Sequence, residues 1–167
     1  IGRPKGVNVF FVPRRPYLPP GTLREVLAYP LSVENFGVHA FTDSLERVGL
    51  KRFAPMLDRS SGWDRELNWD EQQRLMLARL LIHEPRWIVL DEVLDSIDGE
   101  TRTRALEIFS SELKDAAIVH IGRGNCSDPT FTRVLHLVKD PRSHKLVRQK
   151  PAETTSLPSG MQLAASP

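Results

Sequence analysis

Two adjacent carboxylates, Asp91 and Glu92, end an uninterrupted apolar run at residues 87–90. A short apolar run that follows a proline, here Pro85, predicts a strand buried on both faces of a parallel sheet. Ligands of such sheets bind at the carboxyl ends of the strands. Because neighbouring strand residues point to opposite faces, the two acids cannot share one role. One suits a hydrated Mg²⁺ ion, and the other suits the orientation of an attacking water molecule. The plain alternative is a strand that ends in a polar loop.

The elements that must position these acids are predicted on both sides of them. Residues 7–12 and 116–121 are apolar runs typical of strands. Thr22 and Glu25 form a capping box, which predicts a short helix that stops at Pro30. Further elements are expected at residues 43–48 (a helix closed by Gly49), 75–82 (a helix with an apolar stripe), 105–113 (a helix) and 133–137 with 145–147 (paired strands). Arg74 and Arg79, on the helix around residues 75–82, are expected to form surface ion pairs.

The order of these segments resembles a known family. Residues 67–74 (LNWDEQQR), the helix that follows, residues 87–92 and residues 93–98 stand like the signature helix, Walker B strand and D-loop of ATP-binding cassette (ABC) ATPases. The resemblance covers about residues 7–140. It is strongest to the ATPase half of fused permease/ATPase transporters, which include bacterial peptide or vitamin B12 transporters and peroxisomal fatty-acyl half-transporters.

The resemblance implies an α/β fold, with a P-loop-type parallel sheet, helices on both faces and a small helical subdomain. The expected division is an amino-terminal strand (1–13), a helical subdomain (14–83), the ATPase core (84–147) and a disordered tail (148–167). The P-loop pattern G-x-x-x-x-G-K-[ST] does not occur in this sequence. We therefore expect an incomplete sheet without the Walker A strand, loop and helix, and a chain that is inactive alone.

Site residues follow from the same resemblance. It assigns Asp91 to the Mg²⁺ ion and Glu92 to the attacking water. It assigns phosphate or cross-dimer contacts to three residues of the signature region and one of the D-loop. The signature residues are Asn68, Glu71 and Gln72, and the D-loop residue is Asp98. Asp98 followed by Gly99 is also an ordinary helix entry, so a structural role is the alternative there.

Two departures from the family bear on the loops around the phosphates. Arg14 stands where the family has the Q-loop Gln; a guanidinium cannot bind a metal, although it can contact phosphate. A solvated loop arginine is the alternative. Arg123 stands where the family has the H-loop His, and we place it ahead of His120 as a catalytic phosphate contact. Arginine supplies charge, but it cannot shuttle a proton near neutral pH.

The signature helix departs as well, with Asn68 for Ser and Asp70 for Gly. A fixed charge on Asp70 near a phosphate would be repelled by about 4 kcal/mol per unit charge at 4 Å and an effective dielectric constant near 20. Asp70 and Gln73 also form a D-x-x-Q pattern, which predicts that Asp70 caps the helix. Weakened phosphate binding is the favoured interpretation.

Bulk properties narrow the possibilities. The formal net charge of +2 gives no reason to expect nucleic-acid binding, and the single cysteine, Cys126, excludes an internal disulfide. No apolar run approaches the length of a membrane span. A transporter permease would therefore have to lie outside this chain.

Three functions remain, in order of preference. The first is the carboxyl-terminal part of an ATP- and Mg²⁺-dependent domain that powers transport, paired with a permease and a second nucleotide-binding domain. It would lie at the cytoplasmic face of a bacterial inner membrane in preference to a peroxisomal one. The second is a catalytically impaired domain that acts as a structural or regulatory dimerisation partner. The third, a DNA-maintenance ATPase, ranks last because residues 15–67 leave no room for a large insertion.

Overall fold

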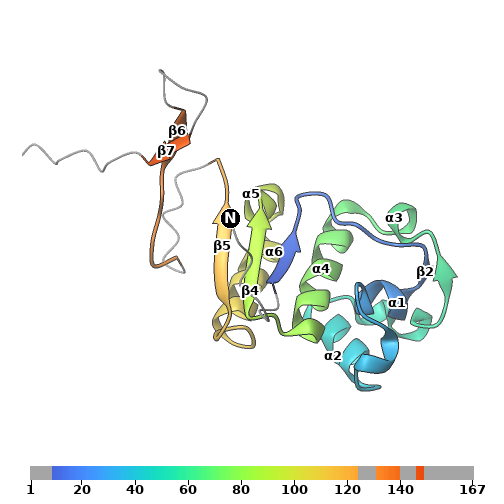
Figure 1. Ribbon diagram of the computed structural model, residues 1–167. Coiled ribbons are helices and arrows are strands. Elements are labelled where there is room, and N and C mark those ends of the chain that lie inside the picture. The colour runs from blue at the N-terminus through green and yellow to red at the C-terminus, as the bar shows by residue number, and fades with distance from the viewer. Residues whose placement is uncertain (1–8, 124–130, 140–145, 149–167) are drawn as a thin grey trace, which may run out of the picture. The chain divides into compact units, whose positions relative to one another are not determined.

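Three parallel strands form the main sheet among the described residues (Figure 1). The computed structural model describes residues 9–123, 131–139 and 146–148. Strand β4 (Trp87–Asp91) lies between β1 (Val9–Val12) and β5 (Ala117–Ile121), and all three run in the same direction. The predicted α/β class with a parallel sheet is confirmed, and its strands are the apolar runs that the sequence indicated.

The two faces of this sheet differ sharply. Strand residues alternate between faces, so alternate positions report on each face. One face carries the buried side chains Phe10, Val12, Ile88 and Leu90. The other face exposes the large apolar side chains Phe11, Trp87, Val119 and Ile121. The second helical layer that the sequence predicted is thus not found among the described residues.

A group of short helices lies on the β1 side of the sheet (Figure 1). Its members are α1 (Leu23–Ala28), α2 (Ala40–Arg47), α3 (Trp63–Glu66) and α4 (Trp69–His83), with 3₁₀ helices at Val33–Asn35 and Lys51–Met56 and a small antiparallel ladder of β2 (Gly21–Thr22) and β3 (Ser60–Ser61). The predicted capping box is confirmed, since the Glu25 backbone N–H donates to the Thr22 hydroxyl and the Thr22 N–H donates to Glu25. Gly49 closes the second helix with a φ of 75°, a conformation that favours glycine.

Arg79 of α4 is buried in the helical group, so the prediction of a surface ion pair is wrong for this residue. Its side chain donates to the backbone carbonyls of Tyr17, at 3.1 Å, and Val26, at 2.5 Å. Only 2% of Arg79 is exposed, and burial lowers the pKa of its guanidinium to about 10. Arg79 lies beside the apolar stripe of α4, which faces the interior. Its side chain links α4 to α1 and to the loop that precedes α1.

None of the helices in the described ranges combines the length and apolar character that a bilayer crossing requires.

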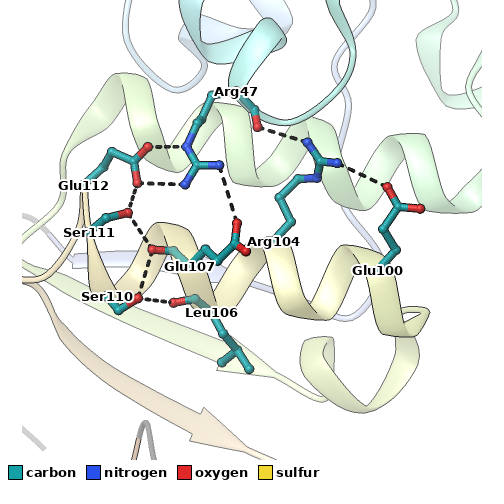
Figure 2. A network of polar contacts seen from close by, with 8 residues as sticks. All are labelled: Arg47, Glu100, Arg104, Leu106, Glu107, Ser110, Ser111 and Glu112. Carbon is teal, nitrogen blue, oxygen red and sulfur yellow. Dashed lines mark hydrogen bonds and ion pairs between the residues drawn. The ribbon is translucent and has the colours of Figure 1, made fainter.

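Two further helices follow the central strand. They are α5 (Val93–Ser96) and α6 (Gly99–Ser110), and α6 buries Ala105, Ile108 and Phe109. Figure 2 shows the polar network at the end of α6, in which Arg47 of α2 pairs with Glu112 and lies 3.8 Å from Glu107. Arg104 completes the link by donating to the Arg47 backbone carbonyl. These contacts join the helical group to the helix that follows the central strand.

Residues 131–167 form a second compact unit, separate from residues 1–130. Its described part includes an antiparallel pair, β6 (Leu137–Lys139) and β7 (Leu146–Arg148). The predicted first strand is wrong for residues 133–136, which are not in a strand, and the observed pair joins residues 137–139 to residues 146–148. The finer four-part division of the chain stays a prediction; of the tail expected at residues 148–167, Arg148 ends β7 and residues 149–167 lie outside the described residues.

The Arg47–Glu112 pair should make stability depend on pH in the acid range. The Arg47 hydrogen bond lowers the pKa of Glu112 from 4.5 to about 2. A carboxylate with a depressed pKa stabilises the folded state above its unfolded pKa and loses that effect as the pH falls. The Glu112 side chain is 38% exposed, so the effect is screened and amounts to about 1 kcal/mol or less. Glu112→Gln should lower the urea midpoint at pH 7 and match the parent near pH 2. The exposed Glu34→Gln is the control, and a difference that persists near pH 2 would contradict the assignment.

Arg79 gives a second stability prediction. Arg79→Met should destabilise the fold by about 2–4 kcal/mol, because two backbone carbonyls lose their buried donor. Arg79→Lys should also destabilise it, since a single ammonium cannot replace the planar fork that reaches both carbonyls. Urea unfolding measures both, with the exposed Arg15→Met as a control. A midpoint for Arg79→Met equal to that of the control would refute this role.

Candidate functional site

Glu92 lies between two arginines at the carboxyl edge of the sheet. Arg14 follows the end of β1, and Arg123 follows the end of β5, each by two residues. Arg14 Nη1 lies 3.3 Å from Glu92 Oε2, and Arg123 Nε lies 2.5 Å from Glu92 Oε1. Because β4 is the middle strand, its carboxyl end lies between the ends of its two neighbours. The structure thus brings together three of the residues that the sequence predicted.

The backbone of Glu92 turns away from the strand direction. Its φ is 53°, in the left-handed region, which costs a residue other than glycine roughly 1–3 kcal/mol. The Glu92 N–H donates to the Ile121 carbonyl at 2.8 Å, so the turn remains tied to β5. This conformation lifts the carboxylate out of the strand's alternation and toward the arginines. Asp91 keeps the strand conformation and pairs with Ile121 in register.

A pocket of about 200 Å³ opens at this edge, and its lining residues are Arg14, Glu92, Asp95, Ser96 and Arg123. Glu92 is 23% exposed, whereas the side chains of Arg14 and Arg123 are 61% and 83% exposed. The carboxylate is therefore the inner group, and the two guanidinium groups cover it from the solvent side. Such a pocket offers donors to an anion at its mouth.

Hydrogen bonds from other elements fix the two arginine backbones. Gln73, buried on α4, donates from Nε2 to the Arg14 carbonyl at 2.9 Å. The Arg123 N–H donates to Asp95 Oδ2 at 3.1 Å. A Cβ atom at Gly122 would lie 2.6 Å from that same Asp95 oxygen, so a side chain there would displace the Asp95 carboxylate. Neither Gln73 nor Asp95 was predicted as a site residue; the available signal for Asp95 was its place three residues after Glu92.

Asp91 is the residue that the sequence predicted to bind a magnesium ion. It is partly exposed at the end of the central strand, and no hydrogen bond occupies its carboxylate among the described contacts. The described residues contain no cluster of three or more acidic, His or Cys side chains arranged for a metal. Mg²⁺ is commonly held by one or two carboxylates together with substrate phosphates and water, and magnesium binding by Asp91 remains a prediction.

The side chains that begin α4 are occupied in holding the helix start. Asn68 is the N-cap and accepts from the Glu71 N–H at 2.9 Å, while Glu71 accepts from the Asn68 N–H at 2.9 Å. Glu71 also pairs with Arg52. Gln72 donates to the backbone carbonyls of Asp64 and Leu67. Phosphate binding by Asn68, Glu71 and Gln72 remains a prediction.

Asp70 does not cap the helix, so that prediction is wrong. Asn68 has extended backbone angles (φ −68°, ψ 170°), and the helix begins at Trp69, which leaves Asp70 inside the first turn. The Asp70 carboxylate pairs with Arg74 and accepts from the Thr101 hydroxyl at 2.5 Å. The predicted surface ion pair of Arg74 is thereby confirmed. The negative charge of Asp70 is compensated within the protein, which reduces the repulsion expected from its charge alone.

Asp98 caps α6 by accepting from the Thr101 N–H at 2.9 Å. The start of α4 and the start of α6 are therefore joined through Asp70, Thr101 and Asp98. The Trp69 indole also donates to the Ser96 carbonyl at 3.4 Å.

His120 lies on β5 opposite Leu90 and is partly buried. Burial lowers the pKa of His120, although the charge of Asp95 opposes this shift. Arg123, and not His120, makes the direct ion pair with Glu92. The preference for Arg123 over His120 as a phosphate contact remains a prediction.

The parallel sheet, with an acidic residue at the end of its central strand, defines an α/β fold that a protein of known structure shares. A bacterial Atm1-family ABC exporter with ATP bound matches 69% of this chain and 21% of its own, with a TM-score of 0.57 and 18% identity. That likeness shows the fold. No protein-family model matches the chain.

Sequence relatives of this chain are ATP-binding proteins of ABC transporters. An uncharacterized ABC transporter ATP-binding protein of Haemophilus influenzae is 34% identical over 115 residues, which are 69% of this chain and 19% of that protein. The mouse ATP-binding cassette sub-family D member 3 is 32% identical over 105 residues, which are 58% of this chain and 16% of that protein. The homologues of this chain are thus ABC transporter ATP-binding proteins, both bacterial and of sub-family D. The chain spans about a fifth of the Haemophilus relative's length.

The capping role of Glu71 can be tested without nucleotide. Glu71→Ala should destabilise the fold by about 2 kcal/mol, because the Asn68 N–H and the Arg52 guanidinium group both lose their acceptor. Glu71→Gln should cost less, since glutamine at this position can also complete a capping box. Urea unfolding in nucleotide-free buffer measures both, with Glu34→Ala as the exposed control. Equal midpoints for Glu71→Ala and the control would show that Glu71 does not hold the helix start.

Proposed function

We propose that this chain is the carboxyl-terminal part of an ATP-binding domain that couples ATP binding and hydrolysis to transport across a membrane. The observation that supports it most is the Glu92 carboxylate, placed at the end of the central strand beside two arginines and next to Asp91. The family of its homologues supports the same function.

Each site residue has a distinct role in this proposal. Asp91 would hold Mg²⁺, which when bound neutralises charge on the phosphate oxygens. Arg14 and Arg123 would bind phosphate through their guanidinium groups. Glu92 would orient the attacking water and accept its proton. Asn68, Glu71, Gln72 and Asp98 would contribute the start of α4 and the adjoining loop to a nucleotide held across a dimer.

The proposed partners are a permease and a second nucleotide-binding domain, with no nucleic acid. The proposed location is the cytoplasmic face of a bacterial inner membrane, reached through that permease. Two bacterial relatives, from Haemophilus influenzae and Synechocystis, support the bacterial assignment with 34% and 38% identity. Sub-family D relatives at 32–34% identity support the alternative location, a peroxisomal membrane.

A second candidate is an impaired domain that dimerises without turnover. The observation that favours it is the pairing of Glu92 with both arginines, since each carboxylate oxygen already accepts from a guanidinium group. Water orientation by Glu92 requires that at least one of these pairs be given up.

Turnover of ATP in the full-length protein, with its natural upstream sequence, separates the two candidates. The motor function predicts Mg²⁺-dependent hydrolysis that Glu92→Gln lowers by about 100-fold or more, because a positioned general base contributes a factor of that order. Glu84→Gln, at an exposed position, is the control and should hydrolyse ATP like the parent.

Nucleotide binding without hydrolysis in the parent would support the impaired partner instead. Hydrolysis that Glu92→Gln leaves unchanged would remove Glu92 from the proposed mechanism.

A further inference from the structure

The two arginines at the sheet edge share a single anion, and that anion belongs to the protein. Arg14 donates to one Glu92 oxygen and Arg123 to the other. The donors come from the ends of two different strands, so their convergence depends on the fold and not on nearness in sequence. Guanidinium groups bind carboxylate and phosphate with the same donors. Glu92 therefore lies where the arginines could otherwise receive a phosphate.

We propose that Arg14 and Arg123 form one site for the γ-phosphate, the terminal phosphate of ATP. Glu92 fills this site when no phosphate is bound. The γ-phosphate displaces Glu92 when ATP binds. The inference rests on the proposed ATP-binding function and assigns the order in which its residues act. The carboxylate becomes available to a water molecule only after the phosphate has taken over the arginines.

The exposure of the arginines makes this exchange feasible. Arg14 and Arg123 are 61% and 83% exposed, and ion pairs of exposed arginines are weak. A buried pair would instead hold Glu92 permanently, because separating buried charges carries a large desolvation cost. A terminal phosphate brings more charge than a carboxylate and can accept from both guanidinium groups at once.

Among the described residues that line the pocket, the other side chains do not supply competing donors. Asp95 adds a negative charge, but its Oδ2 accepts from the Arg123 N–H and thereby holds the backbone of that arginine. The Ser96 hydroxyl donates to the Val93 carbonyl at 2.9 Å. Asp91 is the other acid at this edge. Recognition of an anion here thus depends on the two arginine side chains.

Equilibrium binding by the full-length protein, in buffer without Mg²⁺, tests the exchange without turnover. The probes are ATP and ADP. ADP lacks the γ-phosphate, which is the terminal phosphate of ATP. The variants are Glu92→Gln, the double variant Arg14→Gln/Arg123→Gln and the triple variant, with Arg15→Gln as a matched exposed arginine. This set forms a double-mutant cycle between Glu92 and the arginine pair.

The exchange predicts that Glu92→Gln tightens ATP binding about fivefold and ADP binding less than twofold, since only ATP competes for the arginines. In the double arginine variant, ATP binding should weaken about tenfold, and adding Glu92→Gln should then change it less than twofold. Arg15→Gln should bind like the parent.

Two results would overturn the inference while leaving the proposed function intact. One is a gain from Glu92→Gln that persists in the double arginine variant, which would show simple removal of a nearby negative charge. The other is an equal gain for ATP and ADP. Failure of the parent and every variant to bind either nucleotide would instead overturn the proposed function itself, and the inference with it.

Discussion

The parallel pairing of three strands is the constraint on which the candidate site depends. Glu92, Arg14 and Arg123 are up to 109 residues apart in sequence, yet each follows the end of a strand in the order β1-β4-β5. Parallel register brings those ends to the same edge, and the left-handed turn at Glu92 then aims its carboxylate between its neighbours. A shift in the pairing of either outer strand would separate the charges.

The beginning of α4 shows how helix-capping requirements shape the rest of the site. An exposed helix start has unpaired N–H groups that attract anions, and here an asparagine and a glutamate side chain satisfy part of that demand. Asp70, in the first turn of α4, accepts a hydrogen bond from the Thr101 hydroxyl of α6, and this contact links the starts of the two helices. The helical group and the sheet edge are also linked by Gln73, which holds the Arg14 carbonyl. The geometry around Glu92 is therefore set by α4 as well as by the strands.

Much of this fold could be predicted from the sequence, because apolar runs, a capping box and a closing glycine are local signals. The sequence also indicated Glu92, Arg14 and Arg123 as site residues, through their positions relative to family motifs. It did not indicate that the three would meet, since ion pairing across strands depends on register and on a turn with positive φ. Asp70 was misassigned because two overlapping capping patterns compete, and the one that begins at Asn68 prevails. Arg79 was misassigned because its backbone carbonyl partners leave no trace in sequence.

The uncovered sheet face, with Phe11, Trp87, Val119 and Ile121 toward solvent, has a consequence for handling the protein. Contiguous apolar patches in water favour self-association and bind hydrophobic dyes. Light scattering and dye fluorescence of the 167-residue chain should therefore rise with concentration and temperature, and assays at the lowest workable concentration would keep colloidal behaviour from being mistaken for assembly.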